Sequence, residues 1–435
     1  MSPSITLLYE KFLASGLQVC TDTRKLIPNS IFFALKGDNF NANEFALKSL
    51  EQGCSYAVID EERYKSGERT ILVKDALETL QALAHHHRKQ FEIPFIAITG
   101  SNGKTTTKEL INAVLSKKYN TLATQGNLNN HIGVPLTLLS VRKEHEMAII
   151  EMGANHQGEI DLLCRIADPD YGIITNVGKA HLEGFGGIEG VIKGKSELYR
   201  YILEKKGKIF VHGDDEVLNG LLPNNDKITY GTKKLYDVIG KLNEKAEQVE
   251  FAWKTRYTAP QLKDAPFLKT QLVGIYNYYN LLCAACVGIT FRVEEQQINE
   301  ALTSYVPSNM RSQLLRTAYN TLILDYYNAN PSSMSAAIEN FSKMNAANKM
   351  LVLGDMLELG EDTVKEHQHI LDLLREKQLE NYVLVGPVFN SISREKSFTD
   401  SDKAYTYLKQ LHLKENTILI KGSRGIKLEN VLEAF

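Results

Sequence analysis

Cysteine is scarce in this chain, with five residues among 435, and the count is odd. So few cysteines argue against a disulfide framework, and reduced thiols in a cytoplasm are expected. Cys283 and Cys286 form a CxxC pair, but the pair lies in an apolar helical run, NLLCAACVGI. We therefore interpret both as core residues and not as a redox or metal pair.

Long apolar runs and blocks of one charge are also missing. No apolar run approaches the roughly 20 residues that span a membrane as a helix. The first residues, MSPSITLLYEKFLASG, lack the basic start and long apolar core of a signal peptide. The net charge is −2 with no basic block, which argues against nucleic-acid binding. These absences predict a cytoplasmic protein with no membrane insertion and no nucleic-acid partner.

The length of 435 residues predicts two or three domains, and the 43% hydrophobic and 23% charged residues are typical of globular proteins. Strands alternate with helices, which predicts an α/β fold. We expect a small N-terminal α/β domain (1–90), a central P-loop-type domain with a mostly parallel sheet flanked by helices (91–310), and a C-terminal Rossmann-like α/β domain (311–435). Residues 207–275 show mixed strands and loops, and VPSNMR, at 306–311, is the expected hinge.

The stretch FIAITGSNGKTTT, residues 95–107, has the pattern of a phosphate-binding loop. An apolar strand runs into a glycine turn, and a helix is expected from Lys104. Backbone N–H groups of such a turn can approach a polyphosphate, the lysine can reach its outer phosphates, and a threonine hydroxyl can bind Mg²⁺. The strict pattern would place a further glycine at Ile98, so a plain glycine turn with a solvated lysine is the alternative. The candidate loop residues are Gly100, Ser101, Asn102, Gly103, Lys104, Thr105 and Thr106.

Polar residues also follow other strands of the central range. Glu151 follows the run MAII, and His181 follows the run YGIIT by a few residues. Ligands of parallel sheets gather at the carboxyl ends of strands, and a carboxylate there could serve Mg²⁺. The residues alone leave a purely structural role open for both. The asparagine-rich stretch at 125–130 is either an exposed loop or a ligand cradle, and Lys195, as a lone helical lysine, would ordinarily be solvated.

Six stretches together carry a resemblance to a known family: TGSNGKTTTKE, TQGNLNNHIGVPLTLL, EMGANHQGEI, TNVGKAHLEGFG, DYYNANPSSM and LGDMLELG. They resemble the Mur ligases, and the similarity runs through all three expected domains. The resemblance implies ATP- and Mg²⁺-dependent joining of an amine to a carboxylate through an acyl phosphate. The YNANP stretch is similar to the branch that adds D-alanyl-D-alanine to a UDP-N-acetylmuramoyl-tripeptide. That reaction is the last cytoplasmic peptide addition in peptidoglycan precursor synthesis, and we expect a monomer.

The resemblance also assigns roles to individual positions. It implies that Lys104, Lys195, His181 and Arg311 are catalytic, with Lys195 carried as an N-carboxylated side chain. Metal ligation falls to Thr105, Glu151, His181 and Lys195. ATP binding, beyond the loop, falls to Asn277, Asn280, Arg311 and Asp325. Substrate binding falls to Thr23, Arg24, Asn41, Asn127, Asn129, Asn130, Tyr327, Asn328 and Asn330.

Three positions depart from the pattern of the Mur ligases. Leu324 precedes Asp325 where an Asp-Asp pair is usual, Tyr276 stands for a histidine, and Asn41-Ala42-Asn43 replaces an Asp-Gly-His. The last change bears most on the expected nucleotide contacts. Three alternatives remain: an amide ligase of this superfamily with another acceptor, a P-loop ATPase or kinase, and a nucleotide-binding module without catalysis.

Overall fold

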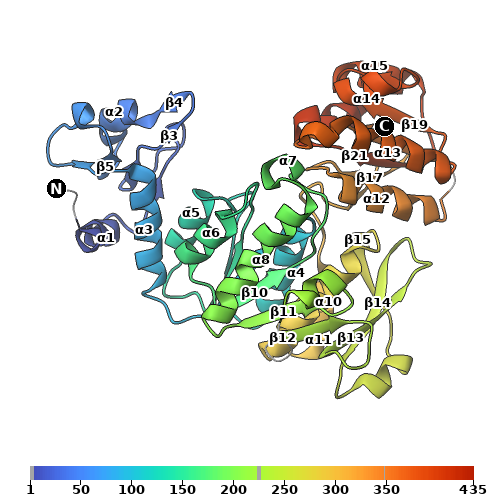
Figure 1. Ribbon diagram of the computed structural model, residues 1–435, viewed down its shortest axis with the longest axis horizontal. Coiled ribbons are helices and arrows are strands. Elements are labelled where there is room, and N and C mark those ends of the chain that lie inside the picture. Colours follow the sequence, from blue (N-terminus) through green and yellow to red (C-terminus); the bar gives the residue numbers. More distant parts are fainter. Residues whose placement is uncertain (1–3, 223–226, 347) are drawn as a thin grey trace.

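The structure is a computed structural model, and it describes residues 4–222, 227–346 and 348–435. Figure 1 shows three parts that follow one another along the chain, from blue through green and yellow to red. Each part is built around one main sheet, and these sheets contain four, nine and six strands. All three are α/β arrangements, as the alternation of strands and helices predicted.

The first part has a small parallel sheet. Its strands, in spatial order, are β1 (Val19–Cys20), β2 (Ile31–Phe33), β5 (Tyr56–Ile59) and β6 (Thr70–Leu72). The ribbon β3 (Lys36–Gly37) and β4 (Phe40–Asn41) and the helices α1 (Ile5–Ala14), α2 (Ala46–Glu51) and α3 (Ala76–Arg88) complete this part. Helix α3 packs against α5 (Gly133–Leu139) and α6 (Glu159–Ala167) of the middle part. Arg88 fixes this junction, because its buried guanidinium donates to the carbonyls of Ala167 and Asp168.

The middle sheet has nine strands. In spatial order they are β15 (Leu268–Val273), β14 (Gln248–Thr255), β13 (Val238–Asn243), β12 (Lys227–Gly231), β11 (Lys208–His212), β10 (Tyr171–Ile174), β7 (Phe95–Thr99), β9 (Met147–Glu151) and β8 (Thr121–Ala123). The pairs from β8 to β13 are parallel, whereas β14 and β15 are added antiparallel. The mixed stretch expected at 207–275 thus extends the central sheet.

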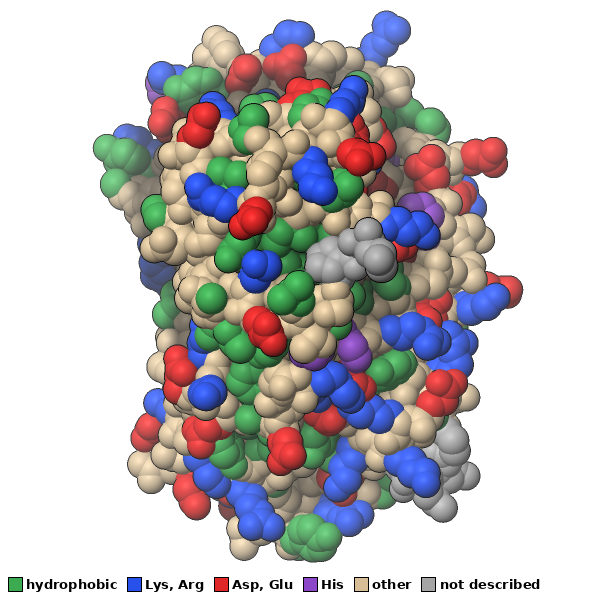
Figure 2. All heavy atoms as spheres, turned by 90° about the vertical axis from the view of Figure 1, so that its left-hand side faces the viewer, with side chains coloured by type: hydrophobic (Ala, Val, Ile, Leu, Met, Phe, Trp, Pro, Cys, Tyr) green, Lys and Arg blue, Asp and Glu red, His purple; other side chains and the backbone are tan. Residues whose placement is uncertain are grey.

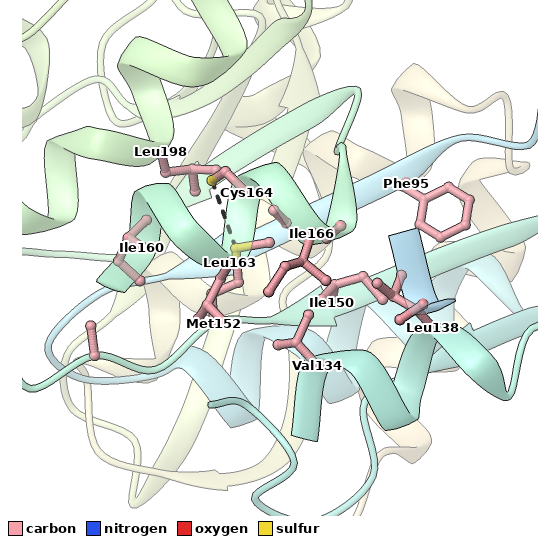
Figure 3. Packing of buried hydrophobic residues seen from close by; sticks show 14 of the residues in the cluster. Phe95, Val134, Leu138, Ile150, Met152, Ile160, Leu163, Cys164, Ile166 and Leu198 are labelled. Atoms are coloured by element: carbon pink, nitrogen blue, oxygen red, sulfur yellow. Dashed lines mark hydrogen bonds between the residues drawn. The ribbon is translucent and has the colours of Figure 1, made fainter. Parts of the chain in front are cut away.

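Helices cover both faces of this sheet because strand β7 is apolar on both sides. Phe95 and Ala97 face a core shared with α5, α6 and α8 (Ile188–Glu204), part of which is drawn in Figure 3. Ile96 and Ile98 face a second core shared with α4 (Lys104–Leu115), α10 (Asn277–Thr290) and α11 (Glu295–Ser304). Alternate side chains of a strand point to opposite faces, so a continuous apolar run requires two covering layers.

The third part repeats this three-layer plan with six strands. In spatial order they are β16 (Gln313–Arg316), β17 (Thr321–Asp325), β21 (Thr417–Lys421), β18 (Lys349–Gly354), β19 (Tyr382–Val385) and β20 (Ser397–Phe398). Only β16 runs antiparallel to its neighbour. One face packs on α12 (Pro331–Lys343) and α13 (Thr363–Glu376), and the other on α15 (Ser401–Gln410). A parallel sheet covered on both faces agrees with the expected Rossmann-like arrangement.

The burial of the cysteines agrees with the sequence analysis. All five cysteines are free and buried, and Cys283 and Cys286 lie inside α10, which confirms them as core residues. Over the described ranges, none of the helices combines the length and apolarity that crossing a bilayer requires. Figure 2 shows the face of the first part, where basic and acidic side chains are interspersed.

Candidate active site

The loop between β7 and α4 has the backbone that phosphate binding requires. Gly100 has φ +141° and Gly103 has φ +78°, both in the region that favours glycine. A Cβ atom on Gly100 would lie 2.0 Å from Thr175 Oγ1, so only glycine fits there. The segment that follows strand β10 holds the loop, because Asn176 Oδ1 accepts from the Asn102 N–H at 3.0 Å. The loop is therefore held open at the N-terminus of α4, where backbone N–H groups favour anions.

Lys104 curls back over this loop. Its Nζ donates to the carbonyl of Gly100 at 2.6 Å and to that of Ser101 at 3.3 Å. Burial lowers the pKa of the Lys104 ammonium to about 8, although Glu151 opposes this shift, and the Arg311 charge adds to it. An ammonium at a glycine loop is suited to bind a polyphosphate.

Glu151 lies at the end of β9 and is 1% exposed. Its Oε1 accepts from the Thr105 hydroxyl at 3.2 Å and from the Asn129 amide at 2.8 Å. Its Oε2 is buried without a hydrogen bond, and Lys108 Nζ lies 3.8 Å away. A buried carboxylate oxygen without a hydrogen bond, beside a threonine hydroxyl, fits a hard cation such as Mg²⁺.

The other ligands of such an ion would not come from a cluster of acidic side chains. Among the residues that the structure describes, no group of three or more His, Cys, Asp or Glu side chains could hold a metal. Lys195 is 1% exposed, and its Nζ lies 3.3 Å from the carbonyl oxygen of Ala154. Burial, and then the nearby Lys104 charge, lower the pKa of Lys195 to about 7. Lys195 lies on a helix, as expected, but its side chain is buried and not solvated. A sizeable fraction of its amine is therefore neutral near pH 7.

Loops of the third part meet the middle part at this edge. Asn330, the N-cap of α12, donates from Nδ2 to Asn102 Oδ1 at 2.8 Å. His181 has φ +51°, and its Nδ1 lies 2.5 Å from Glu358 Oε2 in the loop after β18. Lys179 pairs with Glu366 at 2.6 Å. Loops at the carboxyl ends of strands in the two sheets therefore meet one another, and Figure 1 shows the third part next to the middle part.

Of the ATP residues expected outside the loop, Asn280 touches it and Asn277 lies beside Asn280. A Cβ atom on Gly103 would lie 2.9 Å from Asn280 Oδ1, so α10 touches the glycine turn. Asn280 donates to Asn277 Oδ1 at 2.9 Å, and both side chains are buried. Asp325 ends β17 and binds Lys421 Nζ at 2.6 Å. The two departures nearby are accommodated, since Leu324 is buried in the core and Tyr276 hydrogen-bonds the Ser312 hydroxyl at 3.0 Å.

The expected nucleotide residues of the first part lie on its own loops. Arg24 pairs with Asp22 at 2.9 Å and is largely exposed. Asn41 donates to Glu61 Oε1 at 2.9 Å and accepts from the Asn43 amide at 2.9 Å. In the described parts of the chain no contact joins Thr23, Arg24 or Asn41 to the glycine loop.

The asparagine stretch and the YNANP stretch are partly structural. Asn129 joins Glu151, whereas Asn130 Oδ1 accepts from the Gly133 N–H at the start of α5. Asn127 is exposed. Tyr327 stacks on the Arg311 guanidinium at 4.0 Å, and the Asn328 side chain accepts from the Ala329 N–H. The structure thus brings Asn129, Tyr327 and Asn330 to the site most directly.

Several residues around the site were not singled out from the sequence. Lys108 and Glu109 follow the loop directly on α4, and Lys179, Glu358 and Glu366 join the two parts. The motifs TTTKE and LGDMLELG contain three of them. Their partners lie far away in the sequence, so the local pattern could not reveal their contacts.

Comparisons with known proteins give a consistent relationship. The profile of the Mur ligase middle domain matches residues 98–288, and that of the Mur ligase glutamate ligase domain matches residues 310–424. A Bacillus subtilis protein named UDP-N-acetylmuramoyl-tripeptide–D-alanyl-D-alanine ligase is 34% identical, over 98% of this chain and 94% of its own length.

Two solved structures share the whole architecture. MurF from Acinetobacter baumannii superposes with a TM-score of 0.83 at 32% identity, covering 95% of this chain and 92% of its own. The MurF ligase of Thermotoga maritima, solved in complex with ADP, gives 0.84 at 26% identity and covers 96% of both chains. Full-length identity above 30%, two matching domain profiles and a common three-part architecture lead to one conclusion: the chain belongs to the Mur ligase family.

Proposed function

We propose that this chain is an ATP-dependent ligase that joins D-alanyl-D-alanine to a UDP-N-acetylmuramoyl-tripeptide. The full-length similarity to relatives of that name carries the proposal. The site supports it, because a glycine loop with Lys104, a buried Glu151 and a buried Lys195 lie at one sheet edge. The reaction would be the last cytoplasmic peptide addition of peptidoglycan precursor synthesis, and we place the protein in the cytoplasm.

We assign the binding of the UDP end, of ATP and of the acceptor to three different domains. Residues 1–90 hold the UDP end of the substrate, with Thr23, Arg24 and Asn41 as contacts. Residues 91–310 hold ATP, and residues 311–435 close over it and present the acceptor. Asn127, Asn129 and Asn130 contact the sugar end, and Tyr327, Asn328 and Asn330 the acceptor side. Each of the three main sheets lies within one of these ranges, which supports the division.

The chemistry follows in two steps. A terminal carboxylate oxygen of the tripeptide attacks the γ-phosphorus of ATP, the bond to the ADP oxygen breaks, and an acyl phosphate forms. The neutral amine of D-alanyl-D-alanine then attacks the acyl carbon, loses a proton and expels inorganic phosphate. Phosphoryl transfer depends mainly on positioning and charge neutralisation. Lys104 and Arg311 bind the phosphates, while Asn277, Asn280 and Asp325 orient the nucleoside.

Magnesium, when bound, supplies positive charge to the phosphate oxygens. Thr105, Glu151, His181 and Lys195 would hold it. Lys195 would do so as a carbamate, because a carbamate offers anionic oxygen where an ammonium repels the cation. The low pKa of Lys195 supports this modification, since only a neutral amine attacks carbon dioxide.

Phosphate release from ATP tests the proposal. Purified protein is incubated with Mg²⁺ and UDP-N-acetylmuramoyl-tripeptide, with and without D-alanyl-D-alanine, and mass spectrometry follows the product. Release that depends on the dipeptide and yields a UDP-muramoyl pentapeptide supports the ligase. Release that ignores the dipeptide would indicate another acceptor or an ATPase, and no release above background would indicate a binding module.

A further inference from the structure

A carboxylate on the phosphate-loop helix binds the linker that leads into the third part. Glu109 lies one turn beyond Lys104 and Thr105 on α4. Both of its oxygens accept from Asn309 Nδ2 at 3.0 Å, and Oε2 also accepts from the Tyr305 hydroxyl. Tyr305 is the C-cap of α11, and Asn309 belongs to the expected hinge VPSNMR. The linker is therefore attached to the helix that carries the ATP loop.

Both donors to Glu109 are neutral, so the contact is a hydrogen-bonded anchor and not an ion pair. Burial, and then the adjacent Glu109 carboxylate, raise the pKa of Tyr305, which keeps its hydroxyl protonated as a donor. Hydrogen bonds to a charged acceptor are stronger than neutral ones. The Asn309 side chain also has a buried oxygen without a partner, so its amide group is held mainly by Glu109.

The anchored residue stands two positions before Arg311, in a backbone of unusual conformation. Met310 has φ +58° and Ser312 has φ +51°, so two non-glycine residues in the left-handed region flank Arg311. Such conformations are unfavourable, and they persist only where surrounding contacts hold them. On the far side, Asp325 Oδ1 accepts from the Ser312 N–H at 3.2 Å. On the near side, the Met310 N–H donates to Gln313 Oε1 and the Met310 carbonyl accepts from the Tyr327 N–H, both at 3.3 Å. Glu109 adds a third contact there by holding the side chain of Asn309.

Arg311 lies beside a loop of the third part that contacts the phosphate loop. Its guanidinium stacks on Tyr327 at 4.0 Å, and Asn330, three residues further along that loop, donates to Asn102 Oδ1 at 2.8 Å. Arg311 Nε is buried without a hydrogen bond. The stacking orients the guanidinium plane, whereas the position of the backbone that carries it depends on the contacts of Met310, Ser312 and the anchored Asn309.

We propose that Glu109 is a positioning residue, which holds Asn309 and the strained turn 310–312 so that Arg311 reaches the phosphates of ATP. The inference rests on the proposed function in taking Arg311 to face ATP. It adds that the ATP-loop helix itself sets the position of an arginine supplied by the third part. Displacing a charge by about 1 Å can lower a rate by roughly 100-fold.

A double-mutant cycle tests the role. Glu109→Ala, Arg311→Ala and the double variant are compared by kcat and KM for ATP, and by the Kd of a fluorescent ATP analogue. We expect Glu109→Ala to lower kcat by about 10- to 100-fold with a much smaller change in Kd. In the Arg311→Ala background, Glu109→Ala should lower kcat by less than about 3-fold, because the two residues act as one unit. Equal losses in both backgrounds, or full activity of either single variant, would overturn the proposal.

Two further variants separate positioning from folding. Glu109→Gln keeps an oxygen acceptor for Asn309, and we expect it to restore most of kcat. Glu300→Ala removes a carboxylate of neighbouring α11 that contacts exposed Lys117 at 3.5 Å, and it should leave kcat unchanged. Failure of Glu109→Gln to recover activity would overturn the role. If the wild-type chain forms no pentapeptide, the proposed function fails. The double-mutant cycle can then be measured on ATP hydrolysis, and it still tests whether Glu109 positions Arg311.

Discussion

Asn330 and Asn102, which are 228 residues apart, join the third sheet's first helix to the ATP loop through a hydrogen bond of 2.8 Å. Asn330 also caps α12, since its Oδ1 accepts from the Ser333 N–H at 2.9 Å. One side chain therefore caps a helix and also contacts the candidate phosphate loop. The two roles use different atoms and can be separated by mutation.

Asn330→Asp keeps the capping oxygen but removes the donor to Asn102. We expect the free energy of unfolding to stay within about 0.5 kcal/mol of wild type, because aspartate caps helices as well as asparagine. Activity should fall by roughly tenfold, the effect of one lost hydrogen bond at a partly buried site. Asn330→Ala should lower activity by a similar factor, and it should also lower the free energy of unfolding by about 1 kcal/mol because the cap is lost. Asn102→Ala, which leaves the cap intact, is the control. Normal kcat/KM in both Asn330→Asp and Asn102→Ala would contradict this account.

Lys104→Ala is expected to lower kcat by roughly 100-fold or more, because a preorganised cation at the transferring phosphate is lost. The loop carbonyls of Gly100 and Ser101 lose a donor, yet they can be hydrated, so the unfolding temperature should change little. Lys117→Ala removes an exposed lysine soon after the same helix and should behave as wild type. Steady-state phosphate release and thermal unfolding are the measurements. Near-full activity of Lys104→Ala would show that the site is elsewhere.

Gly100→Ala tests the shape of the loop. The added Cβ would meet Thr175 Oγ1 at 2.0 Å, and φ +141° strains any other residue. We expect at least a tenfold loss of nucleotide affinity, measured with a fluorescent ATP analogue, because the N–H groups of the loop must shift. Gly220→Ala is the control, because none of the residues that the structure describes lies within 4 Å of the added Cβ, and affinity should be unchanged. Unaltered affinity in Gly100→Ala would mean that the loop does not bind the phosphates.

Carbamylation of Lys195 should depend on pH. Because burial lowers the pKa of Lys195 to about 7, the amine is protonated and unreactive below that pH and neutral above it. With ¹³C-labelled bicarbonate, a carbamate signal in the ¹³C NMR spectrum should therefore grow as the pH rises through about 7. Lys195→Ala should abolish the signal. Lys193→Ala, an exposed lysine two residues away, should retain it. A signal that survives Lys195→Ala would assign the modification elsewhere.

Much of the site could be predicted because it depends on neighbours in the chain. The apolar run 95–99 followed by Gly100 and Gly103 specifies strand, turn and helix through local backbone preferences alone. The strand-end positions of Glu151 and Asp325 follow from the same alternation. The sequence predicts the antiparallel strands β14 and β15 less clearly, because their place in the central sheet depends on which strands they pair with and not on residue propensity.

The sequence by itself determined the α/β class, the glycine loop, the core cysteines and the family. Only the tertiary structure decided that Lys195 is buried while Lys193 is exposed, and that Glu109 binds Asn309, 200 residues away. Helical spacing says which side chains share a face, but it does not say what that face meets. Burial, the pKa of Lys195 and the anchoring of Arg311 arise when distant segments pack together, and that information is spread over the whole chain.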